Sequence, residues 1–140
     1  MRAVLTKWFT SINAFLIRIS KGRIGSQLGT QSILILHTNG RKSGQPHSTP
    51  VAYFEREGRY LVVGSNWGRP HDADWVRNLR RNPLGRIDVK GQSFAVQAHE
   101  AEGEEYSRLW EYVTRLHPPY LRYQQATSRR IPIVIFERTR

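Results

Sequence analysis

Residues 37–50 read HTNGRKSGQPHSTP, and an apolar segment lies on each side of them. Residues 33–36 (ILIL) precede the stretch, and residues 51–54 (VAYF) follow it. Asn39-Gly40 and Ser43-Gly44 are dipeptides typical of turns. The stretch therefore predicts a loop that joins two neighbouring strands.

The loop carries two cations at its tip, Arg41 and Lys42, and then the small hydroxyl residues Ser43, Ser48 and Thr49. Cations, hydroxyl donors and the free backbone N–H groups of a glycine-containing loop favour an anion such as a phosphate. A P-loop is excluded, because the Gly-x4-Gly-Lys-Ser/Thr spacing is missing and a strand rather than a helix follows. An ordinary basic hairpin loop is the alternative interpretation.

The composition is that of one globular domain. The chain has 140 residues, 39% of them hydrophobic, with four tryptophans, which is enough to bury a continuous core. It has no cysteine, which excludes disulfides, thiolate metal sites and cysteine nucleophiles. No two of its five histidines are four residues apart, so we expect no metal site.

The formal net charge is +11, and the first acidic residue is Glu55. Such a field attracts an anionic partner: nucleic acid, an acidic membrane surface or a polyanionic small molecule. The sign of the charge alone does not separate these three.

The N-terminal residues show the pattern of an amphipathic helix. Apolar side chains recur on one face between Val4 and Ile19, and the opposite face includes Lys7 and Arg18. The longest apolar run is far below the ~20 residues that span a bilayer. We expect residues 1–24 to form this helix and a linker, and residues 25–140 to form the domain. The helix either packs on the domain or binds an anionic membrane surface.

The rest of the chain predicts further strands with helices between them. Asp72 is a candidate N-cap for the first of these helices, and His117-Pro118-Pro119 ends the second. Glu100, Glu102, Glu104 and Glu105 gather where the second helix begins and favour its dipole. Mostly hairpin connections indicate an α+β fold with an antiparallel sheet or barrel. We expect strands at 60–65, 86–89, 93–99 and 131–136, helices at 73–81 and 104–116, and a short segment at 120–127.

No hydrolytic site stands out in the sequence. Ser65, His71 and Asp72 resemble a Ser-His-Asp set in type, but no Gly-x-Ser-x-Gly elbow surrounds Ser65. Aromatic residues are frequent beside the expected anion loop, which suits a flat heterocyclic cofactor. These residues are Trp67, Trp75, Tyr120 and Tyr123.

Several motifs follow one another along residues 33–137. They are Thr38-Asn39-Gly40-Arg41-Lys42-Ser43-Gly44-Gln45-Pro46 with Thr49-Pro50, Val63-Gly64-Ser65-Asn66, Trp75 with Asn78-Leu79 and Asn82-Pro83, Pro119-Tyr120-x-x-Tyr123-Gln124, and Arg130-Ile131-Pro132-Ile133-Val134. This ordered set resembles the deazaflavin-dependent nitroreductase and quinone reductase family. Members of that family have the split β-barrel fold of FMN-binding-like proteins and use reduced coenzyme F-420, a deazaflavin with a phosphate and an oligoglutamate tail, to reduce quinones or nitro compounds.

The resemblance implies coenzyme F-420 rather than FMN, a cytoplasmic oxidoreductase that is either free or peripheral at the membrane, and no nucleic-acid partner. Hydride passes from the reduced coenzyme to an electrophilic acceptor. Its cofactor-binding residues are expected to be Arg41, Lys42, Ser43, His47, Ser48, Thr49, Pro50, Val51, Ala52, Val63, Gly64, Ser65, Asn66, Asp74, Trp75, Val76, Arg77, Asn78 and Tyr120, and its catalytic candidates Tyr120, Tyr123, His117 and Ser65.

The sequence departs from the family's pattern at three positions. His47 stands where an arginine is common, and Trp67 where a glycine is frequent. His117 replaces a tyrosine on the acceptor side, which puts nitro reduction in doubt. His117 is expected either to supply a proton or only to satisfy the carbonyls of a helix end. The rival functions are a non-catalytic flavin binder and a basic nucleic-acid-binding module.

Overall fold

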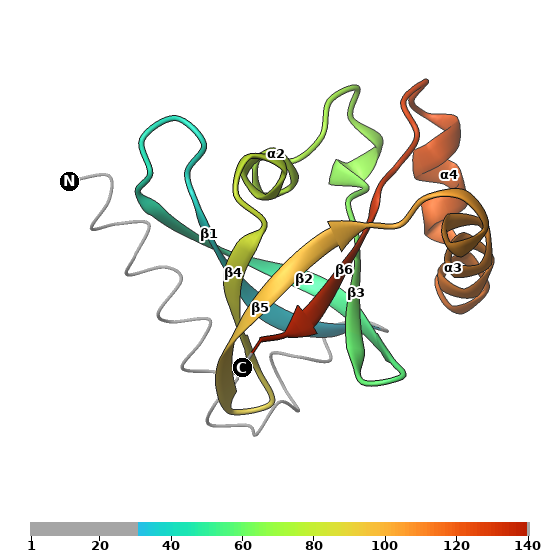
Figure 1. Cartoon of the computed structure of the whole chain (residues 1–140). Helices are drawn as coiled ribbons and strands as arrows, with labels where there is room; N and C mark the ends of the chain where they lie inside the picture. Colours follow the sequence, from blue (N-terminus) through green and yellow to red (C-terminus); the bar gives the residue numbers. More distant parts are fainter. Residues whose placement is uncertain (1–30, 140) are drawn as a thin grey trace.

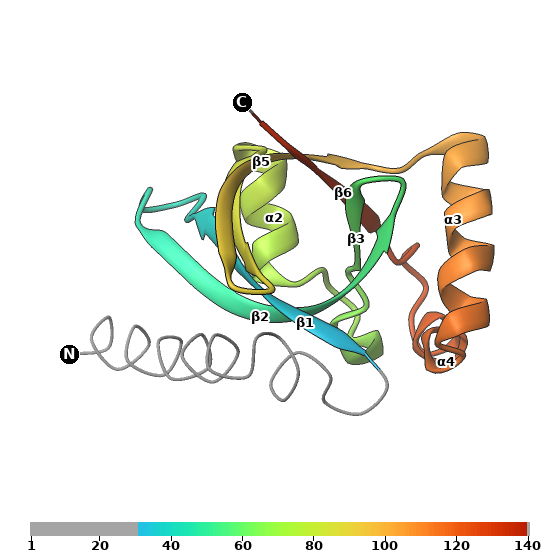
Figure 2. The ribbon, with the colours of Figure 1, turned by 90° about the horizontal axis from the view of Figure 1, so that it is seen from below.

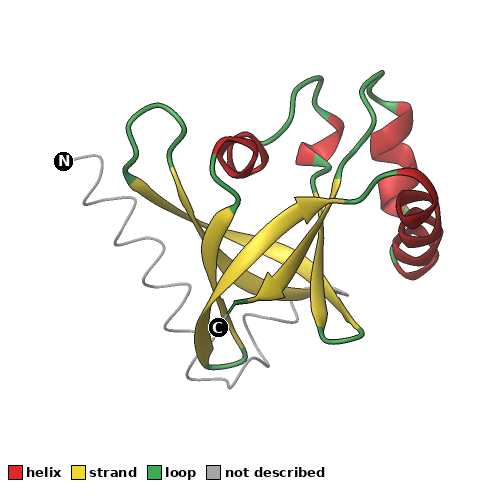
Figure 3. Ribbon diagram, viewed as in Figure 1, coloured by secondary structure: helices red, strands yellow, loops and turns green. Residues whose placement is uncertain are grey.

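The computed structural model describes residues 31–139, which form a closed barrel of six strands with helices at one end and along one side (Figures 1 and 3). The strands follow one another around the barrel in the order β1-β2-β3-β6-β5-β4. Every neighbouring pair is antiparallel. The expected α+β split barrel of antiparallel strands is therefore confirmed.

The strands are β1 (Ser32–Asn39), β2 (Pro46–Arg56), β3 (Arg59–Val63), β4 (Leu84–Val89), β5 (Gln92–Glu100) and β6 (Ile133–Arg138). The helices are η2 (Asn66–Gly68), a single 3-10 turn, α2 (Asp74–Arg81), α3 (Gly103–Leu116) and α4 (Pro119–Gln125). The segment expected to be short at 120–127 is thus helix α4.

Alternating side chains fill the barrel interior. Leu34, Leu36, Val62, Ile87 and Phe136 are each at most 1% exposed and belong to one cluster. Burying such a side chain contributes about 1.5–3 kcal/mol. Because the side chains of a strand alternate between its faces, the pairing register that buries this set is strongly preferred.

A second cluster joins the barrel wall to helices α3 and α4, which lie beside β3 and β6 (Figure 2). Leu61 of β3 and Ile135 of β6 pack there with Val113 of α3 and Tyr120 of α4. The buried hydroxyl of Tyr106 donates a hydrogen bond to the carbonyl of Ile131 at 2.5 Å. This cluster fixes α4 against the barrel.

Helix α2 lies across one end of the barrel, where it is seen through the ring of strands in Figure 2. Its Leu79 packs into the interior cluster. The backbone at Gly64 lies very close to the side chains of Pro132 and Val76, since a Cβ on this glycine would lie 2.9 Å from Pro132 and 3.0 Å from Val76. The β1–β2 loop, η2, α2 and α4 all gather at this end of the barrel (Figure 1).

The structure corrects one expectation about α2. Asp72 is not its N-cap, because Ala73 occupies that position and makes no side-chain cap bond. The carboxylate of Asp72 instead binds Arg80 and Arg129, each at 2.7 Å. Two guanidinium groups outcompete a backbone N–H for the same oxygens, since charge-assisted bonds are the stronger ones.

The other expected details are partly confirmed. Pro132 immediately precedes β6, as a proline at the start of a strand should. Glu104 and Glu105 lie in the first turn of α3, whereas Glu100 binds Arg80 with both oxygens at 2.8 Å. The helix and linker expected for residues 1–24 lie outside the described residues, and the domain boundary stays a prediction.

Candidate active site

Two adjoining pockets open at the helix-covered end of the barrel. We call the first, of about 600 Å³, the polar pocket, and the second, of about 450 Å³, the aromatic pocket. Thr49, Asn66, Ala73 and Trp75 line both of them. A ligand with a polar and a flat part can therefore extend from one into the other.

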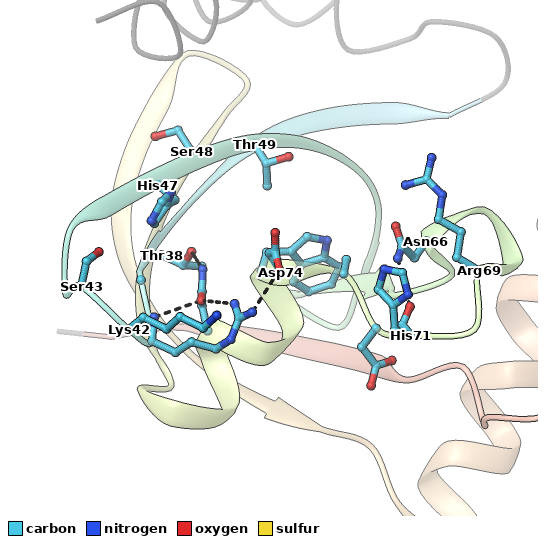
Figure 4. Close-up of a pocket in the computed structure, with 16 residues that line it drawn as sticks. Thr38, Lys42, Ser43, His47, Ser48, Thr49, Asn66, Arg69, His71 and Asp74 are labelled. Carbon is cyan, nitrogen blue, oxygen red and sulfur yellow. Dashed lines mark hydrogen bonds and ion pairs between the residues drawn. The ribbon is translucent and has the colours of Figure 1, made fainter. Parts of the chain in front are cut away.

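The polar pocket is bounded by the β1–β2 loop, which is fastened to α2. The backbone N–H and the guanidinium of Arg41 donate to the side-chain oxygen of Asn78 at 3.1 and 2.9 Å. The buried amide of Asn78 in turn donates to the Thr38 hydroxyl at 3.3 Å. Arg41 also pairs with Asp74 at 3.2 Å, as the dashed lines in Figure 4 show. Asn78 thus holds the loop, with its side-chain polar atoms already satisfied by protein.

Two further cations line this pocket. Lys42 and Arg69 are exposed and lie on opposite sides of it (Figure 4). Among residues 31–139, Lys42 forms no ion pair, and Arg69 makes its hydrogen bonds to Asn66 and Arg129 through its backbone N–H and carbonyl. Cations that no carboxylate neutralises are available to an anionic ligand.

Ser48 is placed differently from its neighbours on β2. Its hydroxyl points away from the polar pocket, whereas His47 and Thr49 lie on the other face of the strand (Figure 4). The Ser48 hydroxyl lies 2.6 Å from Nδ1 of His37, and Nε2 of His37 lies 2.8 Å from Asp88. Ser48 therefore lines the polar pocket as expected, but its hydroxyl is engaged in a contact with His37 on the neighbouring strand.

The aromatic pocket contains a row of four rings. His117 lies 4.8 Å from Tyr120, Tyr120 lies 6.3 Å from Tyr123, and Tyr123 lies 6.1 Å from Trp67, measured between ring centroids. Neighbouring rings are inclined by 59–81°, the edge-to-face range that aromatic pairs prefer. Strands β2 and β3 add the side chains of Val51, Ala52 and Val63, among others, to the lining.

Two titratable groups in the row are shifted toward their neutral forms. Burial raises the pKa of Tyr120, although the amide of Gln31, which donates to its oxygen at 2.8 Å, opposes the shift. Burial also lowers the pKa of His117, with a further contribution from the cation Arg122. Near neutral pH the row is therefore uncharged, with the Tyr120 proton still in place.

Comparison with known proteins agrees with this geometry. The model of the F420H(2)-dependent quinone reductase family matches residues 9–138. The chain belongs to this family. It is 38% identical to the F420H(2)-dependent quinone reductase Rv1261c of Mycobacterium tuberculosis, over 86% of this chain and 84% of that relative.

Solved structures support the same assignment. An F420-H2 dependent reductase aligns with 75% of this chain and 93% of its own, at 34% identity and a TM-score of 0.68. The heme storage protein HutZ of Vibrio cholerae shares the fold alone. It aligns with 77% of this chain over 82% of its own length, at 16% identity and a TM-score of 0.56. The family makes this chain an oxidoreductase whose coenzyme is F420.

Most of the site residues expected from the sequence of this reductase line the two pockets. The side chains of Val76 and Arg77 do not, because Val76 is 1% exposed within the core and Arg77 faces solvent. In the polar pocket lie Arg41, Lys42, Ser43, His47, Ser48, Thr49, Asn66, Asp74, Trp75 and Asn78. In the aromatic pocket lie Thr49, Pro50, Val51, Ala52, Val63, Gly64, Ser65, Asn66, Trp75, His117, Tyr120 and Tyr123.

Several lining residues of the reductase were not expected from its sequence. Those in the β3–α2 connection, Arg69, His71 and Ala73, adjoin Asn66 and could have been found by extending the motif. Gln31 and Ile33 precede or begin β1, and nothing local marks them as site residues. The remaining ones are Thr38, Gly40, Val62 and Asp72. Trp67, which was expected among the aromatic residues near a flat cofactor, also lines the aromatic pocket.

Arg129 was also not expected, and it shapes the site without lining it. Its guanidinium donates to the carbonyls of Ser65 at 2.8 Å and of Arg69 at 3.0 Å, and it binds Asp72 at 2.7 Å. Its side chain is 14% exposed. The reductase thus clamps the whole β3–α2 connection with one side chain.

Residues 31–139 are the part of the chain that the structure describes. They contain no group of three or more potential metal-ligating side chains. None of the helices in this range is long and apolar enough to cross a membrane.

Proposed function

We propose that the chain catalyses hydride transfer from reduced coenzyme F420 to a quinone held in the aromatic pocket. The observation that carries this proposal is the junction of the two pockets through Thr49, Asn66, Ala73 and Trp75. A phosphate-bearing, acidic-tailed coenzyme needs cations at one end and a flat slot at the other. The two pockets offer these in sequence.

The residues present fit the coenzyme. Lys42 and Arg69 are free to bind its anionic part, whereas Arg41 is held by Asn78 and Asp74 and serves to position the loop. Ser43, His47 and Thr49 supply further polar atoms. When bound, the reduced deazaflavin supplies the hydride. The β2 segment from Pro50 to Ala52 would lie beside its flat part.

Reduction of a quinone to a quinol takes a hydride and a proton, and Tyr120 is the proposed proton donor. Because the Gln31 amide donates to the Tyr120 oxygen, the phenolic proton remains available to the aromatic pocket. Its raised pKa keeps that proton on the ring until negative charge develops on the quinone oxygen. Tyr123, His117 and Ser65 line the same pocket and are proposed to orient the acceptor.

The test is a binding titration with the coenzyme and with FMN, followed by addition of a quinone to the protein and the reduced coenzyme. We expect saturable binding of F420 in preference to FMN, and loss of the reduced coenzyme's absorbance signature when the quinone is added. Lys42→Ala should weaken binding by about 1.5 kcal/mol, the lower end of the range for bonds to charged groups, because Lys42 is exposed.

Lys90→Ala is the matched control, since Lys90 is also an exposed lysine but pairs with Glu55 and lines neither pocket. Equal affinities of the Lys42→Ala and Lys90→Ala variants would remove the β1–β2 loop from the site. A parent protein that leaves the quinone oxidised would refute the proposed reaction.

We further propose that residues 1–20 attach the cytoplasmic enzyme reversibly to an anionic membrane, where lipid-soluble quinones are found. The support is the sequence pattern alone: Trp8, Phe9 and Phe15 share a face opposite Lys7 and Arg18. Vesicles that contain anionic lipid should sediment the full chain more completely than a chain that starts at residue 25. Equal sedimentation of the two would favour a helix that packs on the domain.

A further inference from the structure

Trp67 exposes more of its side chain than any other large hydrophobic residue among residues 31–139. It is 71% exposed, although tryptophan is usually well buried. The indole nevertheless lines the aromatic pocket. A large aromatic ring left in water at the edge of a binding pocket is typical of a surface that a ligand completes.

The backbone presents this ring from a fixed turn. Trp67 has φ 61° and ψ 23°, in the left-handed region that bulky residues rarely adopt. The turn is closed by a bond from the Gly68 N–H to the Ser65 carbonyl at 2.9 Å. Arg129 holds the same Ser65 carbonyl and that of Arg69. The indole therefore stands on a strained but well-held turn.

The indole of Trp67 is the last of a row of aromatic side chains in the pocket. Trp67 meets Tyr123 at an interplanar angle of 81° and ends the row that runs from His117 through Tyr120. Tyr120 is 4% exposed, so the row leads from a buried ring to an exposed one. The turn also packs closely on α4, since a Cβ at Gly68 would lie 3.1 Å from the Tyr123 carbonyl.

We propose that Trp67 is a specificity-determining residue for the acceptor, whose indole forms the outer wall of the aromatic pocket against a flat, multi-ring quinone. This inference rests on the proposed quinone reduction. In this arrangement Tyr120 and Tyr123 contact the first ring of a bound quinone. A second, fused ring of the quinone would extend along the row of side chains and contact Trp67. Aromatic contacts of this kind stabilise a bound ring beyond simple burial.

The test compares Trp67→Gly and Trp67→Phe with the parent, each loaded with reduced coenzyme. The Gly variant should fold, because glycine adopts φ 61° without strain. It should raise KM for a naphthoquinone by about 3- to 10-fold, the range expected for loss of an aromatic pair. Its kcat, its coenzyme affinity and its KM for a single-ring benzoquinone should be nearly unchanged. The Phe variant should keep most of the naphthoquinone preference.

A second readout does not depend on turnover. Naphthoquinone added to the protein with oxidised coenzyme should quench tryptophan emission in a saturable way. Trp67→Phe should remove the share of this quenching that comes from Trp67 and leave the share of Trp75, which also lines the aromatic pocket. Trp110→Phe is the matched control, because Trp110 stacks on Tyr106 at 6.0 Å and lines neither pocket. Its quenching should match that of the parent.

Two results overturn the inference while the reaction stands: an unchanged naphthoquinone KM in Trp67→Gly, or full quenching in Trp67→Phe. A parent that binds the coenzyme but reduces neither quinone refutes the proposed function itself, and the role of Trp67 with it. The two failures are therefore distinguishable.

Discussion

At the scale of single residues, the site separates charge from apolar surface. Lys42 and Arg69 line the polar pocket, whereas in the aromatic pocket burial shifts Tyr120 and His117 toward their neutral forms. A neutral quinone then meets an uncharged wall, while the acidic coenzyme meets the cations. Burial of the side chains in the aromatic pocket therefore separates the quinone-binding surface from the coenzyme-binding cations, although the two pockets adjoin.

The pH dependence of turnover should follow from His117. Because the pKa of His117 is lowered by burial and by Arg122, the inflection in quinone reduction should lie below the ordinary histidine value of 6.5. His117→Phe should flatten the profile and leave coenzyme affinity nearly intact. Arg122→Gln should move the inflection upward, because it removes the second cause of the shift. Initial rates between pH 5 and 8, roughly the range in which histidine titrates, check both.

The same shift has a consequence for stability. His117 binds its proton more weakly in the folded state than in the unfolded chain, because its pKa is lowered on folding. Its contribution to the free energy of unfolding is therefore fully present above pH 6.5, and it is lost as the pH falls below 6.5 toward the pKa of the folded state. If the parent and His117→Phe have the same pH profile and the same loss of stability on acidification, His117 only ends the helix.

At the scale of elements, the sequence predicted best where pattern and chemistry are local. The apolar segments on both sides of residues 37–50 became β1 and β2. Ser48 lines the polar pocket as expected, but the contact of its hydroxyl with His37 was not predicted, because it depends on the register that pairs these two residues on neighbouring strands. The role of Arg129 was not predicted, because its hydrogen-bond partners lie 57–65 residues earlier in the chain. A short sequence motif cannot indicate a contact between residues so far apart.

The connection that Arg129 holds should depend on it for stability. Arg129→Met removes bonds to the three backbone carbonyls of Gly64, Ser65 and Arg69 and to the carboxylate of Asp72. It should lower the free energy of unfolding by about 1.5–3 kcal/mol, the range for charged hydrogen bonds. It should also weaken coenzyme binding, because Asn66 and Arg69 lose their fixed positions. Denaturant unfolding and the coenzyme titration measure the two effects.

Arg108→Ala is the control for this change. Arg108 pairs with Glu104 at 3.9 Å on the surface of α3, and both side chains are largely exposed, so its loss should leave stability nearly unchanged. An Arg129→Met variant as stable as Arg108→Ala would show that the connection is held by its own turn and by packing on α4.

At the scale of the whole molecule, a closed barrel brings distant segments to one opening. The polar pocket draws on β1, β2, α2 and the connection before it, and the aromatic pocket adds α4 from near the C-terminus. The strands and hairpin connections of the sequence predicted an antiparallel sheet or barrel, and the family resemblance predicted the split barrel. The strand order β1-β2-β3-β6-β5-β4 was beyond it, because β3 pairs with β6 across about half of the chain and hydrophobic alternation does not say which strands close a sheet.

The excess of positive charge should act on the coenzyme as a long-range field. With a net charge of +11, lengthening the acidic tail of the coenzyme should tighten binding, because each added carboxylate meets the same positive potential. Added salt should reverse that gain, since screening at about 0.15 M confines the field to roughly 8 Å. The matched control is the shortest-tailed coenzyme, whose affinity should change least with salt. Titrations of both forms at two ionic strengths measure the difference. If tail length and salt leave the affinity unchanged, the positive charge serves another anionic partner, such as the membrane surface proposed for residues 1–20.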